Sequence, residues 1–128
     1  MKYVLILSSL LLVMNATAQQ DTTGAKKPVY NYVEAMPTPT FNMPNYLKEN
    51  LHYPAEAKKN HIEGRVIVRF VVTDEGGVTD VQIVRGIGGG CDEEAARVVK
   101  NMPKWKPGKQ NGKAVNVFFN LPIVFKLD

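Results

Sequence analysis

A glycine-rich stretch followed by three acidic residues is the segment whose residue types most directly suggest chemistry. Glycine fills every position from 86 to 90 except Ile87, and Asp92–Glu94 opens the helical pattern that follows. A strand, a glycine-rich loop and a helix N-terminus is the order in which many nucleotide-binding folds hold a phosphate. The stretch therefore has to be weighed as a phosphate site.

The spacing of these residues argues against phosphate binding. A dinucleotide fingerprint, G-x-G-x-x-G, would need its third glycine at Cys91 if it began at Gly86, and at Glu93 if it began at Gly88. No Lys-Ser or Lys-Thr pair follows, as a P-loop requires. Acidic residues in the first helical turn already satisfy the positive end of the helix dipole and would repel a phosphate. We interpret the glycines as a corner between a strand and a helix.

Other groups that could do chemistry are few. The only histidines, His52 and His61, form no metal-ligand spacing, and the single cysteine, Cys91, cannot form an intrachain disulfide. A helix start can activate a thiol, but no second cysteine or catalytic histidine accompanies it. The sequence therefore predicts a protein that is not an enzyme, with no catalytic residues, no metal, no cofactor and no small-molecule substrate.

The N-terminal residues predict a targeting segment. Lys2 precedes an apolar run of about 12 residues, shorter than the roughly 20 that span a bilayer, and an Ala-x-Ala signal ends at Ala18. We expect residues 1–18 to be a cleaved signal peptide, which places the chain in the periplasm. The alternative is an uncleaved anchor that holds it on the inner membrane, facing the periplasm.

Charge makes no case for nucleic acid. Without Lys2 the chain has 15 basic and 12 acidic residues, a balance that favours solubility. One basic run contains no acidic residue. It is either a solvated face or a surface for an acidic protein or an anionic lipid, and its members are Arg97, Lys100, Lys104, Lys106, Lys109 and Lys113.

Proline and apolar periodicity divide the remaining chain. Residues 19–43 are polar and proline-rich, which predicts an extended or disordered leader. From residue 44 to residue 128 a folded domain is expected. It begins with a helix that has Asn42 as a cap and Pro44 in its first turn, and Pro54 starts a second short helix.

The domain continues with alternating and helical patterns. Residues 65–73 and 78–85 predict a β-hairpin around a turn at residues 74–77. Residues 91–102 predict a helix, and residues 104–113 predict a loop with a turn at Asn111-Gly112. A last strand covers residues 114–127, where Pro122 favours a sheet edge. The expected fold class is α+β, with a small antiparallel sheet of about three strands packed against two to three helices.

Several motifs in this order resemble the C-terminal domain of the TonB energy-transducer family, in the form common in Bacteroidetes-type bacteria. They are Tyr53-Pro54, Ile62-Glu63-Gly64, the hairpin, Trp105-Lys106-Pro107-Gly108-Lys109 and Leu121-Pro122-Ile123. The resemblance covers residues 44–127.

The resemblance implies a periplasmic domain that binds TonB-dependent outer-membrane receptors in energy-coupled nutrient transport. A receptor segment, the TonB box, would pair with the C-terminal strand by β-augmentation. The receptor-binding strand implied here is Ala114, Val115, Asn116, Val117, Phe118 and Phe119. Further receptor contacts are implied at His52, Tyr53 and Pro54, although relatives often carry glutamine where this chain has His52.

Three hypotheses follow, all with receptors or other proteins as partners. The chain is a secreted receptor-binding module, a complete energy transducer anchored by its N-terminus and driven by inner-membrane proton-channel components, or an interaction domain repurposed for another partner through the basic run. The leader of about 25 residues spans at most roughly 90 Å when extended, which argues against force transmission. An exposed edge strand also leaves a homodimer open.

Overall fold

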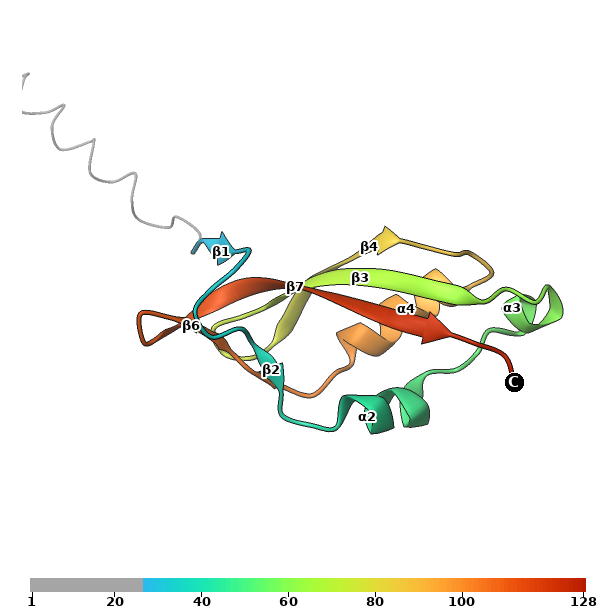
Figure 1. Cartoon of the computed structure of the whole chain (residues 1–128), viewed down its shortest axis with the longest axis horizontal. Helices are drawn as coiled ribbons and strands as arrows, with labels where there is room; N and C mark the ends of the chain where they lie inside the picture. Colours follow the sequence, from blue (N-terminus) through green and yellow to red (C-terminus); the bar gives the residue numbers. More distant parts are fainter. Residues whose placement is uncertain (1–26) are drawn as a thin grey trace, which may run out of the picture.

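The computed structural model describes residues 27–128, so the expected signal peptide at residues 1–18 and the first part of the leader lie outside the described residues. Within that range no helix is both long and apolar enough to cross a membrane. Figure 1 shows a curled sheet with the helix α4 (Cys91–Lys100) beneath it. The described chain is therefore an α+β fold, as the sequence predicts.

The predicted hairpin forms the middle of the sheet. β3 (Gly64–Val72) buries one complete face and pairs antiparallel with β4 (Val78–Arg85). Thr73 closes the turn, because its N–H donates to the carbonyl of Gly77 and its carbonyl accepts from the N–H of Gly76, each at 2.8 Å. Two register shifts interrupt the β3–β4 ladder, and such bulges increase strand twist.

The last strand, β7 (Lys113–Phe125), is longer than its neighbour. It pairs antiparallel with the whole of β3, from Gly64 opposite Phe125 to Val72 opposite Val117. The strand order is β1-β7-β3-β4, where β1 (Val29–Tyr30) lies parallel to β7. The sheet is thus mixed, whereas a purely antiparallel sheet was expected. The difference arises because the leader contributes a strand.

Two short helices and α4 complete the fold. In α2 (Met43–Asn50) the side chain of Asn42 accepts the N–H of Asn45 at 3.0 Å, which confirms the predicted cap. α3 (Ala55–Lys59) follows Pro54 and buries Ala57. α4 packs against β3 and β4 through residues at helical spacing: Cys91, Ala95, Val98 and Val99.

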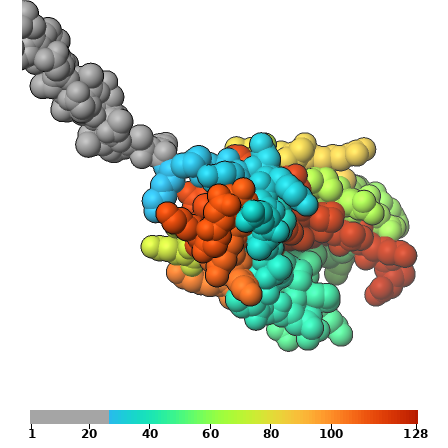
Figure 2. Space-filling model, turned by 60° about the vertical axis from the view of Figure 1, so that its left-hand side comes forward, coloured from blue at the N-terminus to red at the C-terminus, as the bar shows by residue number. Residues whose placement is uncertain are grey.

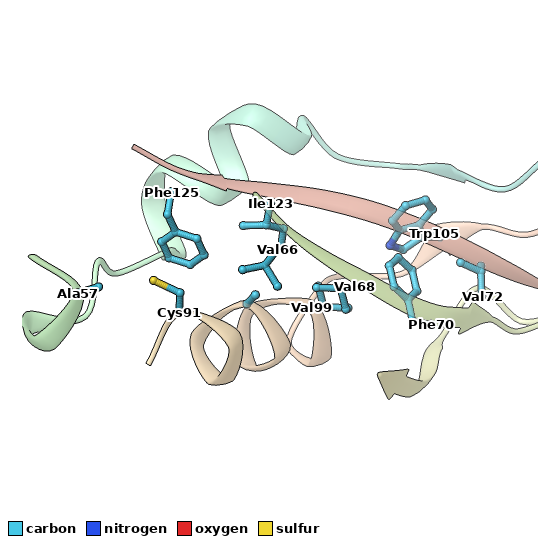
Figure 3. Packing of buried hydrophobic residues seen from close by; sticks show 11 residues of the cluster. Ala57, Val66, Val68, Phe70, Val72, Cys91, Val99, Trp105, Ile123 and Phe125 are labelled. Atoms are coloured by element: carbon cyan, nitrogen blue, oxygen red, sulfur yellow. The ribbon is translucent and has the colours of Figure 1, made fainter. Parts of the chain in front are cut away.

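The core lies between the sheet and α4 (Figure 3). Val66 and Val68 of β3 lie opposite Cys91 and Val99 of α4, and Phe70 lies beside Trp105. Ile123 and Phe125 of β7 close one end of the cluster. Trp105 fills the other end, with its ring 5.5 Å from that of Phe70 and 4.9 Å from that of Phe119. The described part of the chain buries no charged side chain.

The described part of the leader, from residue 27 to the start of α2, lies against the domain. Val33 is buried, and Ala35 exchanges two backbone hydrogen bonds with Lys109, at 3.1 and 2.8 Å. β2 (Thr38–Pro39) pairs with β5 (Trp105–Lys106). Figure 2 shows this blue and cyan segment against the orange one. Described residues of the leader therefore pack on the domain predicted to begin at residue 44.

The expected loop at residues 104–113 contains two short strands. Besides β5, β6 (Gly108–Gln110) folds back on β7 as a hairpin. Asn111 and Gly112 have φ values of 53° and 77°, as a two-residue turn of the hairpin type requires. The predicted turn is confirmed, and the residues around it are more regular than a loop.

Candidate functional site

The two edges of β7 have different surroundings. One edge pairs with β3 from Val117 to Phe125. Val117 also pairs with Tyr30 of β1, which must therefore lie on the opposite edge. On that opposite edge no described strand pairs with residues 118–125. Pro122 lies in this stretch, where its missing N–H costs no hydrogen bond within the sheet.

The predicted receptor-binding residues occupy three environments along β7. Ala114 and Val115 pair with β6, and Asn116 and Val117 pair with β1. Phe118 and Phe119 lie where the open edge begins. The sequence predicted these six residues as one uniform binding segment. In the structure, only part of the segment is free to pair with a new strand.

Side chains of this segment also contribute to the fold. Val117 is fully buried, and the amide oxygen of Asn116 accepts the N–H of Asp74 at 2.7 Å. Phe119 packs on Trp105, while the guanidinium of Arg69 lies 3.9 Å above the ring of Phe118. A partner strand would consequently contact this segment mainly through the backbone of β7.

An apolar groove of about 490 Å³ runs beside the downstream end of β7. Residues of α2 and of the chain after it form one wall, and the end of β7 forms the other. Its apolar lining comprises Met43, Pro44, Leu47, Leu51, Tyr53, Pro122, Val124 and Phe125, and Lys48 and Lys126 add positive charge. Val124 is 56% exposed there. Sequence reasoning predicted the helix that corresponds to α2 but not this groove, since both walls are needed to form it.

The structure places His52, Tyr53 and Pro54 at this end of β7. The ring of Tyr53 lies 5.6 Å from that of Phe125, edge to face. Its hydroxyl donates to the carbonyl of Ile62, and desolvation raises the pKa of that hydroxyl. Phe119 and Phe125 are six residues apart, which is about 20 Å along a strand. The two predicted contact regions are therefore separated along β7.

A charged cluster holds the chain around His52. Glu94 accepts the backbone N–H of His52 at 2.8 Å and two N–H groups of Arg97 at 2.9 and 2.7 Å. Arg97 also donates to the carbonyl of Asn50 at 2.7 Å. The hydrogen bond from Arg97 is the main reason that the pKa of Glu94 is lowered. This cluster links the segment after α2 to α4.

The glycine-rich stretch contains its own anion. One carboxylate oxygen of Asp92 accepts the N–H of Ile87 at 2.8 Å and that of Gly88 at 3.3 Å. A Cβ at Gly86 would lie 2.1 Å from the Asp92 carboxylate, so the loop closes tightly around that side chain. Gly90 has a φ of 88° and ends the corner before α4. This geometry supports the interpretation of the glycines as a corner.

Other reactive groups form no site in the described chain. Cys91 is buried, and desolvation raises the pKa of its thiol, the opposite of activation. Residues 27–128 contain no cluster of three His, Cys, Asp or Glu side chains that could hold a metal ion. The edge of β7 and its groove remain the best-formed candidate site.

Comparisons with known proteins identify the family and agree with this fold. The profile of the family described as Gram-negative bacterial TonB protein C-terminal matches residues 49–127. Protein TonB of Salmonella typhimurium is 36% identical over 111 residues, which cover 79% of this chain and 44% of that protein. Protein TonB of Escherichia coli is 42% identical over 73 residues, which cover 54% of this chain and 29% of that protein. The chain thus spans less than half the length of these relatives.

Solved structures show the same fold. The solution structure of the Pseudomonas aeruginosa TonB C-terminal domain aligns with a TM-score of 0.50 at 22% identity, covering 81% of this chain and 97% of that one. A Helicobacter pylori TonB C-terminal domain aligns with a TM-score of 0.50 at 23% identity, covering 66% and 77%. Because the family profile matches more than half of the residues of this chain, the chain belongs to the TonB C-terminal domain family.

Proposed function

We propose that this chain is a periplasmic module of energy-coupled nutrient transport that binds TonB-dependent outer-membrane receptors. A receptor segment, the TonB box, adds as a strand to the outer edge of β7. Family membership supports the class of partner. The binding mode follows from β-augmentation, in which backbone hydrogen bonds supply affinity and side-chain pockets supply selectivity.

The observation that carries this proposal is the open edge at residues 118–125. Alternate residues of this eight-residue stretch direct their backbone groups to this edge, opposite the edge paired with β3, and Pro122 lacks an N–H. An exposed strand edge is a ready template for pairing with another chain. The apolar groove lies beside its downstream end and would accept an apolar side chain of the added strand.

The two predicted contact regions then belong to one extended partner. A strand that starts beside Phe119 reaches Phe125 and Tyr53 after about 20 Å, or roughly six residues. Lys48 and Lys126 at the groove favour an acidic residue in that part of the partner. His52 is exposed next to Tyr53, where its side chain can meet the receptor surface.

Backbone pairing is tested by NMR titration of the labelled chain with synthetic TonB-box peptides. We expect the largest amide shifts on β7, with smaller shifts at His52 and Tyr53. A peptide N-methylated at alternate residues keeps its side chains but loses donors, so it should bind at least tenfold more weakly. If β7 resonances stay unmoved by every TonB box tried, the proposed function is wrong.

The groove is tested by a matched pair of substitutions, Val124→Ser and Val84→Ser. Both valines are exposed, at 56% and 59%, but Val124 lines the groove whereas Val84 lies on β4 at the far edge of the sheet. Covering the exposed half of a valine is worth about 1 kcal/mol, or roughly fivefold in affinity. We expect that loss for Val124→Ser alone. Equal losses would place the contact elsewhere.

Two further experiments separate the remaining hypotheses. The first reverses the charge of three residues of the basic run, Lys104, Lys106 and Lys109. We expect TonB-box binding to be unchanged at moderate salt. Loss of partner binding while β7 stays intact would favour a repurposed interaction domain. Intact-mass measurement on the native protein reads the N-terminus. A mature chain that begins at Gln19 supports a released module, and a chain that retains residues 1–18 supports an anchored transducer.

A further inference from the structure

β1 occupies the outer edge of β7 within the segment proposed to bind receptors. Val29 pairs with Asn116 and Tyr30 with Val117, in parallel orientation. Because Val117 pairs with β3 on its other side, β1 lies on the edge where a partner strand would add. That edge therefore has an intramolecular occupant at residues 116–117 and no described one from residue 118 onward.

The attachment of β1 to the domain is slight. It consists of two residue pairs and, directly after them, a hydrogen bond of 3.3 Å from the Arg69 guanidinium to the side chain of Asn31. Val29 and Tyr30 are only half-buried. The Lys27 ammonium lies 2.8 Å from the Asp74 carboxylate, but its side chain is 75% exposed, so salt screens this ion pair. A cleft of about 180 Å³ remains between β1 and the neighbouring residues of β7. Such a strand can separate from the sheet at little cost.

The chain that follows β1 is anchored independently. Tyr32 is 80% exposed and lies between the two parts. Beyond it Val33 is buried, and Ala35 is held by its two backbone bonds to Lys109. β1 can therefore leave β7 by rotation near Tyr32 while the rest of the leader stays in place.

We propose that β1 is an intramolecular competitor for the receptor-binding edge. A receptor segment that pairs with residues 114–117 must displace it, whereas a segment confined to residues 118–125 binds beside it. This inference rests on the proposed function and adds a regulation of the same site. The open downstream edge lets an incoming strand begin pairing before β1 leaves, so exchange does not require β1 to dissociate first.

The competition predicts a measurable change in affinity. The apparent affinity equals the intrinsic affinity multiplied by the fraction of molecules whose edge is free. If β1 is docked in about ten of every eleven molecules, peptide binding is therefore weakened about tenfold. In the full chain, the double substitution Val29→Pro/Tyr30→Pro removes both backbone N–H groups of β1, including the one directed at β7. We expect a synthetic TonB-box peptide long enough to pair with residues 114–119 of β7 to bind this variant about tenfold more tightly than it binds the unmodified chain. The control Tyr32→Ala, in the same segment but outside β1, should bind as the unmodified chain does.

Hydrogen exchange without peptide provides a readout that does not depend on the receptor. In the proline variant, amide exchange should accelerate at Asn116 or Val117, the two residues with which β1 pairs. The rest of the ladder between β3 and β7 should keep its protection, which shows that the domain remains folded. Unchanged exchange at both residues would mean that β1 does not cover the edge, and it would overturn the inference.

A reversible cross-link tests the same idea in the opposite direction. Val29 and Asn116 are direct partners, and neighbouring strands lie about 4.8 Å apart, within reach of a disulfide. The variant Val29→Cys/Asn116→Cys should bind the peptide at least tenfold more weakly when oxidised than when reduced. Cys91 is buried and leaves this comparison undisturbed.

The outcomes separate this inference from the proposed function. Peptide binding that shifts β7 resonances with equal affinity in the unmodified, proline and oxidised chains overturns the competition and leaves the proposed function intact. Failure of every form to bind any TonB-box peptide overturns the proposed function and the competition with it. Tighter binding by the proline variant together with weaker binding by the oxidised one supports both.

Discussion

Replacing Glu94 with glutamine should loosen the segment that carries the second predicted contact region. Glu94 joins the backbone of His52 to the guanidinium of Arg97, and Arg97 continues to the carbonyl of Asn50. These contacts fix the chain between α2 and α3 against α4. The same chain supplies Leu51 and Tyr53 to the groove. The substitution therefore links domain stability to the shape of the groove.

The magnitude follows from the number of contacts and their exposure. Hydrogen bonds to a charged group contribute about 1.5–3 kcal/mol when they are well shielded. The side chain of Glu94 is 13% exposed, but that of Arg97 is 46% exposed, so solvent screens part of this contribution. Glutamine keeps one carbonyl acceptor and loses the charge and the two-point contact. We expect unfolding free energy to fall by about 1–2 kcal/mol, and the melting temperature by about 5–10 °C.

The loss of unfolding free energy in Glu94→Gln should depend on pH in a defined direction. The pKa of Glu94 lies below its ordinary value of 4.5, first because of the hydrogen bond from Arg97 and then because of the backbone N–H of His52. A carboxyl group whose pKa is lowered by folding stabilises the protein above the unfolded pKa and loses that contribution as pH falls through the folded one. The stability difference between the unmodified chain and Glu94→Gln should be constant near neutral pH and shrink below about pH 4.5.

Urea unfolding followed by the fluorescence of Trp105, the single tryptophan, measures this difference. Glu93→Gln is the matched control, because it removes the same charge from the same helical turn at an exposed residue. If both variants lose equal stability, the effect belongs to the helix dipole and the reasoning from the Glu94 contacts is wrong. A difference that persists unchanged at pH 3 would refute the assigned titration.

Two further predictions concern the turns and the glycine-rich corner. Gly76→Ala would place a Cβ 2.2 Å from the carbonyl oxygen of Trp105 at a φ of 85°, so we expect a loss above about 3 kcal/mol in urea unfolding. Gly112→Ala meets open space at a φ of 77° and should cost only about 1 kcal/mol; equal losses would contradict the steric argument. Asp92→Ala frees the N–H groups of Ile87 and Gly88 and should cost about 1–2 kcal/mol. An NMR titration of this variant with inorganic phosphate should show no binding, and saturable shifts in the corner would overturn its interpretation as scaffold.

Elements with strong local signals could be predicted from the sequence. The hairpin at β3 and β4 has an apolar face of period two and a glycine turn, and α4 has apolar residues at helical spacing. The cap at Asn42 likewise follows from residues a few positions apart. In each case the interactions that define the element lie within one continuous stretch of the chain, so a single sequence contains the whole signal.

The short strands could not be predicted in this way. β1, β2 and β5 have two residues each, which is too short for any periodicity. Their partners are distant in the sequence; Thr38 of β2, for example, pairs with Lys106 of β5, 68 residues later. The same holds for the groove, whose two walls come from α2 and from the end of β7. Such features depend on the assembled fold.

The division of the candidate site follows from a mismatch in strand length. β7 has 13 residues and β3 has nine, so residues 113–116 extend beyond the last β3 partner. Backbone donors and acceptors in a folded chain are usually hydrogen-bonded. In this overhang, β6 and β1 are the strands that pair with β7. Downstream of Val117, β3 pairs with only one edge of β7. The leader therefore occupies the other edge only at residues 116–117, where the β3 ladder ends. If a receptor strand pairs with both parts of β7, as proposed, it competes with the chain itself over the first part only.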